Sequence, residues 1–150
     1  MPSHNPLAHD LDIQTLSETD NIKLILKNAK TIAVVGLSPK THRDSYGVSL
    51  VMQQAGYKII PINPNASEIL GEPVFTSLIE AAKVHTIDLV NVFRNSEDVP
   101  PVVDEAIAIH ASAVWLQLGI SHATAIEKAK NAGLLTVQNK CLKVEWRRYS

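Results

Sequence analysis

The sequence predicts an α/β protein of three layers, in which a mostly parallel, doubly wound sheet is covered by helices on both faces. Two observations lead to this prediction. Short apolar runs rich in β-branched residues alternate with amphipathic stretches of about ten to twelve residues, as in a parallel sheet with crossover helices. The run at residues 31–35 stops at Gly36, as a buried strand does when its turn needs close backbone approach.

The composition fits one globular domain. The chain has 150 residues, 45% hydrophobic and 19% charged, and a chain of this length can bury about 70% of its unfolded surface. The net charge of −1 gives no polyanion-binding surface, so we do not expect nucleic acid as the main partner. No apolar run approaches the ~20 residues of a membrane span. The single cysteine, Cys141, excludes an internal disulfide framework and suits a reducing compartment, so the cytoplasm is the expected location.

The chain begins with a segment that lacks a periodic apolar pattern. Residues 1–18 are therefore predicted to form a flexible N-terminal arm, ahead of a single domain at residues 19–150. Ser17 and Asp20 give a capping signal for a short helix that ends near Lys30. This helix is expected to cover an edge or a face of the sheet.

The next elements surround a glycine turn. A strand at residues 31–35 is followed by a basic loop and by a helix at residues 46–55. Asp44 or Ser45 is the expected N-cap of that helix, and Gly56 is its expected end.

The remaining elements repeat this alternation. The expected strands are residues 57–62, a short edge strand within 70–75 that contains a proline, 87–93, 113–117 and 134–137. The expected helices are residues 77–83, 122–132 and a last helical turn within 143–150. A further helix is expected to be capped by residues 95–98, to be entered through Pro100 and Pro101, and to run to about His110. Crossovers in such a sheet are right-handed, and ligands bind at the carboxyl ends of its strands. The residues that follow each strand are therefore the candidates for function.

The loop after residues 31–35 has the features of an anion site. A strand, a turn at Gly36 and a helix N-terminus bring together free N–H groups and the positive end of a helix dipole, which favours a phosphate. Gly36 and Gly47 do not form a G-x-G-x-x-G motif, and no P-loop motif is present. The pattern leaves open a phosphate site and an ordinary strand-to-helix connection. For a phosphate site, a side chain at Gly36 is expected to block binding and to leave the fold mostly intact.

The end of the strand at residues 57–62 argues against a dinucleotide site of the NAD or FAD type. Such a site needs an acidic residue there to bond the ribose hydroxyls, and none is present. Asn63 and Pro64 stand at that place, either in contact with a nucleotide or as a simple Asn-Pro turn.

Three cations lie in the loops at the predicted strand ends. Arg94 directly follows the strand at residues 87–93, and Lys40 and Arg43 lie in the loop after Gly36. An arginine at this edge either forms a surface ion pair or clamps a phosphate with two parallel hydrogen bonds.

No catalytic or metal-binding constellation is predicted. The six histidines form no H-E-x-x-H pair, and His42 and His122, which lie near strand ends, are expected at the surface. Cys141 has no evident base nearby in the sequence, and a lone cysteine usually packs as a small hydrophobe. Trp115 is expected in the core, and Gly119 either brings its backbone close to a ligand or simply ends a strand.

Taken together, these motifs resemble one family. The segments that carry the resemblance are Val34-Val35-Gly36-Leu37-Ser38, Arg43-Asp44-Ser45-Tyr46, Gly56-Tyr57, Pro61-Ile62-Asn63-Pro64, Val92-Phe93-Arg94, Trp115-Leu116-Gln117-Leu118-Gly119 and the region of Cys141. They resemble the small stand-alone CoA-binding domain proteins, which are similar to the CoA-binding domain of the succinyl-CoA synthetase α subunit. The resemblance covers residues 20–148, and its motifs are specific in combination.

The resemblance implies a Rossmann-like fold with coenzyme A lying across the carboxyl ends of the strands. It implies that the loop from Gly36 to Ser45 holds the phosphates, that Asn63 and Pro64 lie by the nucleotide, and that Phe93 and Arg94 line the groove. The turn at residues 139–141 would face the pantetheine arm. The full set of expected ligand-binding residues is Gly36, Leu37, Ser38, Lys40, Arg43, Ser45, Tyr46, Asn63, Pro64, Phe93, Arg94, Gly119, Asn139 and Cys141.

One departure from the family pattern concerns that turn. The family usually has Asp-Arg-Cys where this chain has Asn139-Lys140-Cys141. A function that needs that carboxylate or guanidinium group is therefore not expected to carry over.

Two hypotheses about function follow. The first is a module that binds CoA or an acyl-CoA, has no chemistry of its own, and acts as a sensor or with a protein partner. The second is an enzyme on the same scaffold, either an NAD(P)-binding oxidoreductase or an acyl-transfer enzyme that uses Cys141. The resemblance supports binding and does not support ligase activity, because the phosphorylated histidine of the synthetase lies in a separate domain.

Overall fold

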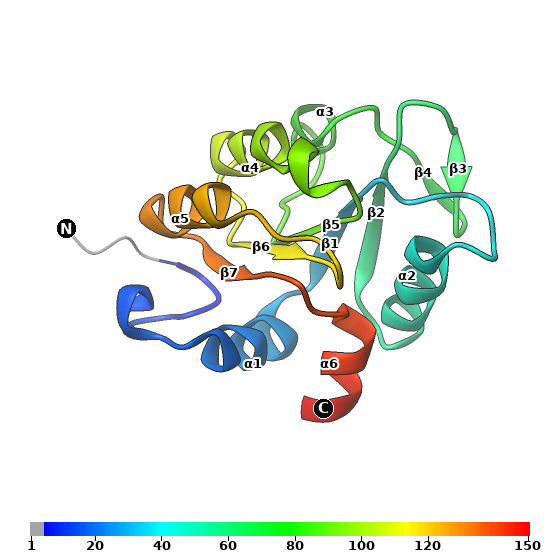
Figure 1. Ribbon diagram of the computed structural model, residues 1–150. Coiled ribbons are helices and arrows are strands. Elements are labelled where there is room, and N and C mark those ends of the chain that lie inside the picture. The colour runs from blue at the N-terminus through cyan, green and yellow to red at the C-terminus, as the bar shows by residue number, and fades with distance from the viewer. Residues whose placement is uncertain (1–4) are drawn as a thin grey trace.

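A parallel sheet forms the centre of the protein. The computed structural model describes residues 5–150 (Figure 1). The five strands of the main sheet are β1 (Thr31–Val35), β2 (Lys58–Ile62), β5 (Leu89–Val92), β6 (Ala113–Leu116) and β7 (Leu135–Val137). Their order is β2-β1-β5-β6-β7, and every neighbouring pair is parallel. The predicted α/β fold with a doubly wound, Rossmann-like sheet is confirmed.

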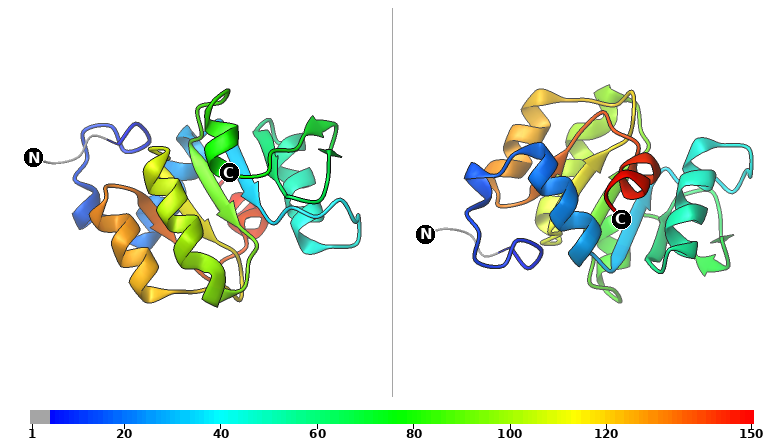
Figure 2. Two further views of the ribbon diagram at one scale, coloured as in Figure 1. Left: turned by 90° about the horizontal axis from the view of Figure 1, so that it is seen from above. Right: turned by 90° about the horizontal axis from the view of Figure 1, so that it is seen from below.

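Helices cover both faces of this sheet (Figure 2). One face carries α1 (Glu18–Asn28), α2 (Asp44–Gln54) and α6 (Leu142–Tyr149). The other carries α3 (Leu78–Ala82), α4 (Val99–Ala108) and α5 (Ala123–Asn131), and a 3-10 turn, η2 (Ser96–Asp98), leads into α4. Figure 2 shows α6 end-on between α1 and α2, so this helix stands out from the sheet and does not lie along it.

The alternation of side chains along each strand builds two cores. Ile32 and Val34 of β1 pack toward α1 and α2, whereas Ala33 and Val35 pack toward α3 and α4. Trp115 is fully buried in the first core, as expected, and its indole Nε1–H donates to the Lys140 carbonyl over 2.8 Å. Because helices cover both faces of the sheet, the sequences of the strands are nearly continuous apolar runs.

The helix starts match the sequence signals at α1 but not at α2. Ser17 and Asp20 form a capping box at α1, as predicted. At α2 the N-cap is Arg43, which makes no side-chain capping bond, and neither Asp44 nor Ser45 fills that position. The prediction was wrong because the Ser45 hydroxyl oxygen accepts a hydrogen bond from the Ser38 N–H, across the preceding loop.

Residues 70–75 do not form an edge strand of the main sheet. Instead, β3 (Glu68–Ile69) and β4 (Glu72–Pro73) form a separate antiparallel hairpin. Leu70 and Gly71 both have positive φ and make its tight turn. Phe75 makes backbone bonds along the edge of β2, donating to the Pro61 carbonyl and accepting from the Asn63 N–H.

Near both ends, the described residues make more contacts and more helix than their sequence patterns predict. The Asn5 side-chain amide donates to the carbonyls of Ser112 and Gly133 over 2.8 and 2.9 Å, and Leu7 is buried. A 3-10 turn, η1 (Ile13–Thr15), follows. These contacts differ from the flexible arm expected at residues 1–18, of which residues 1–4 lie outside the described part. At the other end α6 is a full helix where a single turn was predicted.

No helix within residues 5–150 is long and apolar enough to cross a membrane.

Candidate functional site

The strand order places a topological switch point between β1 and β5. From β1 the chain crosses over to β2 on one side, and from β5 it crosses to β6 on the other. The loops at the carboxyl ends of these two central strands therefore diverge. In open α/β sheets this divergence creates the crevice in which ligands bind.

A pocket of about 430 Å³ opens at this switch point. It is lined by Gly36, Ser38, Lys40, Arg43, Asp44, Ser45 and Phe93. Every one of these except Asp44 belongs to the set predicted to contact the ligand. Asp44, which the sequence offers as an N-cap and which lies in the loop that the resemblance assigns to the phosphates, also lines the pocket, from the first turn of α2.

Gly36 allows β1 and β5 to approach each other at the pocket. Its φ is +85°, and its N–H donates to the Ile62 carbonyl over 3.1 Å, which extends the ladder between β1 and β2. A Cβ at Gly36 would lie 2.3 Å from the carbonyl oxygen of Phe93. The glycine is therefore required by the protein itself, and a side chain there would disturb the backbone before it reached a ligand.

Two serines hold the loop that leads to α2. The Ser38 N–H donates to the Ser45 hydroxyl oxygen over 3.0 Å, and the Lys40 N–H donates to the Ser38 hydroxyl oxygen over 3.1 Å. Each hydroxyl thus accepts a bond from the backbone and keeps its own hydrogen as a donor. The two serines can therefore shape the loop and also donate to an anion in the pocket.

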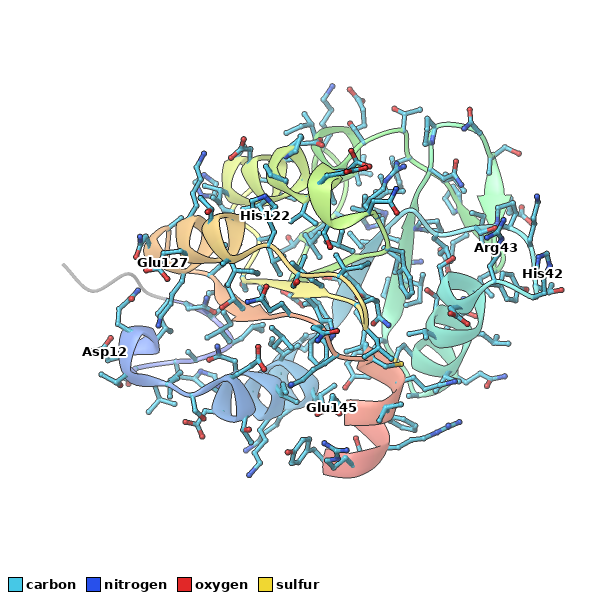
Figure 3. All side chains as sticks on the ribbon, in the orientation of Figure 1. Asp12, His42, Arg43, His122, Glu127 and Glu145 are labelled. Carbon is cyan, nitrogen blue, oxygen red and sulfur yellow. The ribbon has the colours of Figure 1, made fainter. Side chains whose placement is uncertain are left out.

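The N-terminus of α2 and two cations make the pocket favourable to an anion. Arg43 makes no side-chain capping bond, and its carbonyl accepts from the Tyr46 and Gly47 N–H groups. Within residues 5–150, the Asp44 and Ser45 amides of the first turn are therefore left without an acceptor and can bind an anion. Lys40 and Arg43 form no ion pair within residues 5–150. The Asp44 carboxylate, in the first turn, opposes part of this positive charge. Figure 3 shows Arg43 and His42 on the loop before α2, at the edge of the molecule.

Other predicted residues surround the pocket without lining it. The Asn63 side-chain amide donates to the Leu37 carbonyl over 2.9 Å, and its Oδ1 accepts from the Asn65 N–H over 2.8 Å. Asn63 thus forms the Asn-Pro turn and also anchors the loop, while Leu37 is fully buried in the core. Pro64 and Arg94 are exposed at the same edge of the sheet.

Tyr46 lies behind the pocket. It is partly buried and packs against the core on the α1, α2 and α6 face.

A second group of predicted residues meets at the ends of β6 and β7. The Gly119 N–H donates to the Asn139 Oδ1 over 2.8 Å, and the Asn139 N–H donates to the Ile120 carbonyl over 3.0 Å. Asn139 has φ +57°, a conformation that asparagine tolerates better than most residues. Its side chain therefore ties the two loops together.

Cys141 follows this junction, directly before α6, and is partly buried. No hydrogen bond joins its thiol to another group within residues 5–150. The neighbouring Lys140 is paired with Glu18 over 3.2 Å at the start of α1. Nor does any group of three or more His, Cys, Asp or Glu in the described part of the chain lie close enough together to hold a metal.

Comparison with protein families gives one match over most of the chain. The family described as "CoA binding domain" matches residues 30–147. Among curated proteins, the chain is 44% identical over 123 residues to the "Uncharacterized protein YneT" of Bacillus subtilis (strain 168). That alignment covers 82% of this chain and 90% of the relative.

Solved structures give the same fold. A hypothetical protein from Pyrococcus horikoshii OT3 superposes with a TM-score of 0.83 at 33% identity, and 99% of each chain is covered. A Thermus thermophilus protein, cell-free ID.343, superposes with a TM-score of 0.81 at 33% identity, covering 90% of this chain and all of the other. The likeness extends over the whole Rossmann-like sheet, including the strands on both sides of the switch point.

Proposed function

Because the chain belongs to the CoA-binding domain family, we propose that it binds coenzyme A or an acyl-CoA and performs no chemistry of its own. The observation that carries this proposal is the position of the pocket. It opens at the switch point of the sheet and is lined by residues of the loop from Gly36 to Ser45, which the family resemblance assigns to the phosphates. Crevices at this place of an open α/β sheet are where nucleotides bind.

The pocket matches the diphosphate part of such a ligand. The amides of Asp44 and Ser45 and the hydroxyls of Ser38 and Ser45 supply neutral donors. Lys40 and Arg43 supply two positive charges for the phosphates, part of which the Asp44 carboxylate offsets. We assign the third phosphate of CoA, on the ribose, to these cations and to Arg94.

The remaining predicted residues extend from the pocket along the edge of the sheet. We place the nucleotide beside Asn63, Pro64 and Phe93, with Leu37 and Tyr46 supporting the loop from behind. The pantetheine arm then runs toward the junction of Gly119 and Asn139 and ends near Cys141. The hydrogen bonds within that junction support a fixed backbone surface there.

Two features favour binding without catalysis. The Cys141 thiol has no base or carboxylate as a hydrogen-bond partner within residues 5–150, and a thiol needs such activation to react quickly at neutral pH. The strand-end position that a dinucleotide oxidoreductase fills with an acid holds Asn63, whose amide is already engaged with the Leu37 carbonyl.

Calorimetric titration with a panel of ligands tests the proposal. CoA is expected to bind more tightly than dephospho-CoA, and NAD+ is expected not to bind. Mass spectrometry of the native protein is expected to find CoA or an acyl-CoA that co-purifies. Equal affinity for CoA and dephospho-CoA would remove the assignment of the third phosphate, and a co-purifying nicotinamide dinucleotide would overturn the proposal.

A further inference from the structure

Among the residues that the structure describes, two polar side chains lie in the core without a hydrogen-bond partner. Asn91 in β5 is 1% exposed, and neither its Nδ2 nor its Oδ1 has a partner within residues 5–150. Ser49 in α2 is also 1% exposed, and its Oγ is likewise unpaired within the described chain. Native proteins satisfy such groups with protein atoms or with ordered water, because an unpaired buried group costs free energy.

Both side chains belong to the same core. Along β5, Val90 and Val92 point to the face of α3 and α4, so Asn91 points to the opposite face, as Leu89 does. That opposite face is covered by α1, α2 and α6. Ser49 belongs to the buried side of α2, together with Val48, which packs in the core on this face.

The two side chains also lie at the same depth beneath the pocket. Phe93 and Ser45 both line the pocket. Asn91 precedes Phe93 by two strand residues, or about 6.6 Å, on the same face of the sheet. Ser49 follows Ser45 by about one helical turn, or about 6 Å, on a helix that runs opposite to the strands. Asn91 and Ser49 are thus one layer below two residues that flank a single pocket.

We propose that Asn91 and Ser49 together hold an ordered internal water molecule directly beneath the pocket. The unpaired atoms are one amide nitrogen, one amide oxygen and one hydroxyl, and a buried water makes about three hydrogen bonds to such groups. Neither side chain carries a charge, so the site suits a water molecule and not a cation. Phe93 packs against this core and also lines the pocket.

The direct test is a crystal structure of the unmodified, ligand-free protein at a resolution that orders internal waters. One water is expected within hydrogen-bond distance of both Asn91 and Ser49. In solution, the Asn91 side-chain amide protons are expected to show cross-relaxation to water. An empty site, or an Asn91 amide bonded directly to a protein group, would overturn the proposal, as would a site that fills only when CoA is bound.

A double-mutant cycle tests whether the two residues share one site. Asn91→Leu and Ser49→Ala are each expected to raise the unfolding equilibrium constant. In the double variant, the increase is expected to be smaller than the product of the two separate increases by a factor of at least about three. The control combines Asn91→Leu with Ser77→Ala, which removes the N-cap of α3 on the other face of the sheet. That pair is expected to be multiplicative within about twofold.

Multiplicative behaviour of Asn91 and Ser49 would contradict a shared water. If the Asn91 variant does not fold, the structure of the unmodified protein decides the question alone. Neither measurement requires CoA to bind, so the inference can fail or hold independently of the proposed function.

Discussion

Gly36 and the carbonyl oxygen of Phe93 approach so closely that a Cβ added at Gly36 would lie 2.3 Å from that oxygen. This contact joins the ends of the two central strands at the point where the pocket opens. It changes the expected effect of a side chain at Gly36. The sequence pattern alone indicated lost binding with a mostly intact fold, whereas the contact predicts that the fold itself is disturbed.

Gly36→Ala is therefore expected to destabilise the protein. The positive φ of +85° costs an L-residue ~1–3 kcal/mol, and the contact with Phe93 adds to this because the obstacle is backbone. The free energy of unfolding, measured with urea, is expected to fall by at least about 2 kcal/mol.

Gly47→Ala is the matched control. Gly47 lies inside α2, and nothing is within 4 Å of an added Cβ. Alanine there is expected to stabilise the protein by ~0.5–1 kcal/mol, because glycine is the poorer helix residue. If both variants lost similar stability, the contact between Gly36 and Phe93 would not be the cause.

Arg43→Ala is expected to weaken CoA binding by about tenfold at low salt. A charge-assisted hydrogen bond contributes ~1.5–3 kcal/mol, and exposure of Arg43 on the rim favours the lower end of that range. Added salt is expected to reduce the difference between the variant and the unmodified protein. Titrations of both proteins at low and high ionic strength measure this.

Arg147→Ala is the control for charge alone. Arg147 is exposed near the end of α6, away from the pocket. Its replacement by alanine removes the same net charge as Arg43→Ala. Its effect on affinity is expected to stay below about twofold. An Arg43 variant that bound CoA as tightly as this control would show that Arg43 is not a phosphate ligand.

The pocket could be predicted from the sequence because its determinants are local. The strand at residues 31–35, the turn at Gly36 and the start of α2 follow one another within about fifteen residues, so apolar patterning and turn chemistry identify them together. Phe93 joins them because parallel strands end at one edge, and the apolar run before it marks the strand. The exact N-cap, Arg43, escaped prediction because the Ser45 side chain bonds across the loop to Ser38.

The parts that escaped prediction depend on contacts distant in sequence. The Asn5 side chain bonds to the carbonyls of Ser112 and Gly133, more than one hundred residues away. No local sequence pattern predicts hydrogen bonds over such a separation. The hairpin of β3 and β4 was mistaken for a sheet edge because a short run beside a proline has no periodicity that separates the two. The buried, unpaired side chains of Asn91 and Ser49 likewise become visible only when the helices are packed on the sheet.

Cys141→Ser is expected to leave the affinity for CoA within about twofold of the unmodified protein. The thiol has no hydrogen-bond partner within residues 5–150 that would activate it, and serine preserves the size and the backbone before α6. Incubation of the unmodified protein with an acyl-CoA is expected to give no acylated protein by mass spectrometry. Stoichiometric labelling that disappears in the Cys141 variant would instead support an acyl-transfer enzyme.

Tyr57 links stability to alkaline pH. Its hydroxyl donates to the Leu26 carbonyl at the end of α1, and burial raises the pKa of the phenol above its ordinary value. A raised pKa in the folded state means that the neutral phenol stabilises the fold below the unfolded pKa of ~10. That contribution is lost as the pH rises through the higher folded pKa.

Tyr57→Phe is therefore expected to cost ~0.5–1.5 kcal/mol at pH 7, where the hydrogen bond to Leu26 is intact. The difference in stability between the two proteins is expected to shrink as the pH rises above ~10, because only the unmodified protein loses the contribution of the neutral phenol. Urea unfolding of both proteins at neutral and alkaline pH measures this difference. A difference that stays constant up to the alkaline limit of reversible unfolding would mean that the Tyr57 phenol ionises as easily in the folded protein as in the unfolded chain.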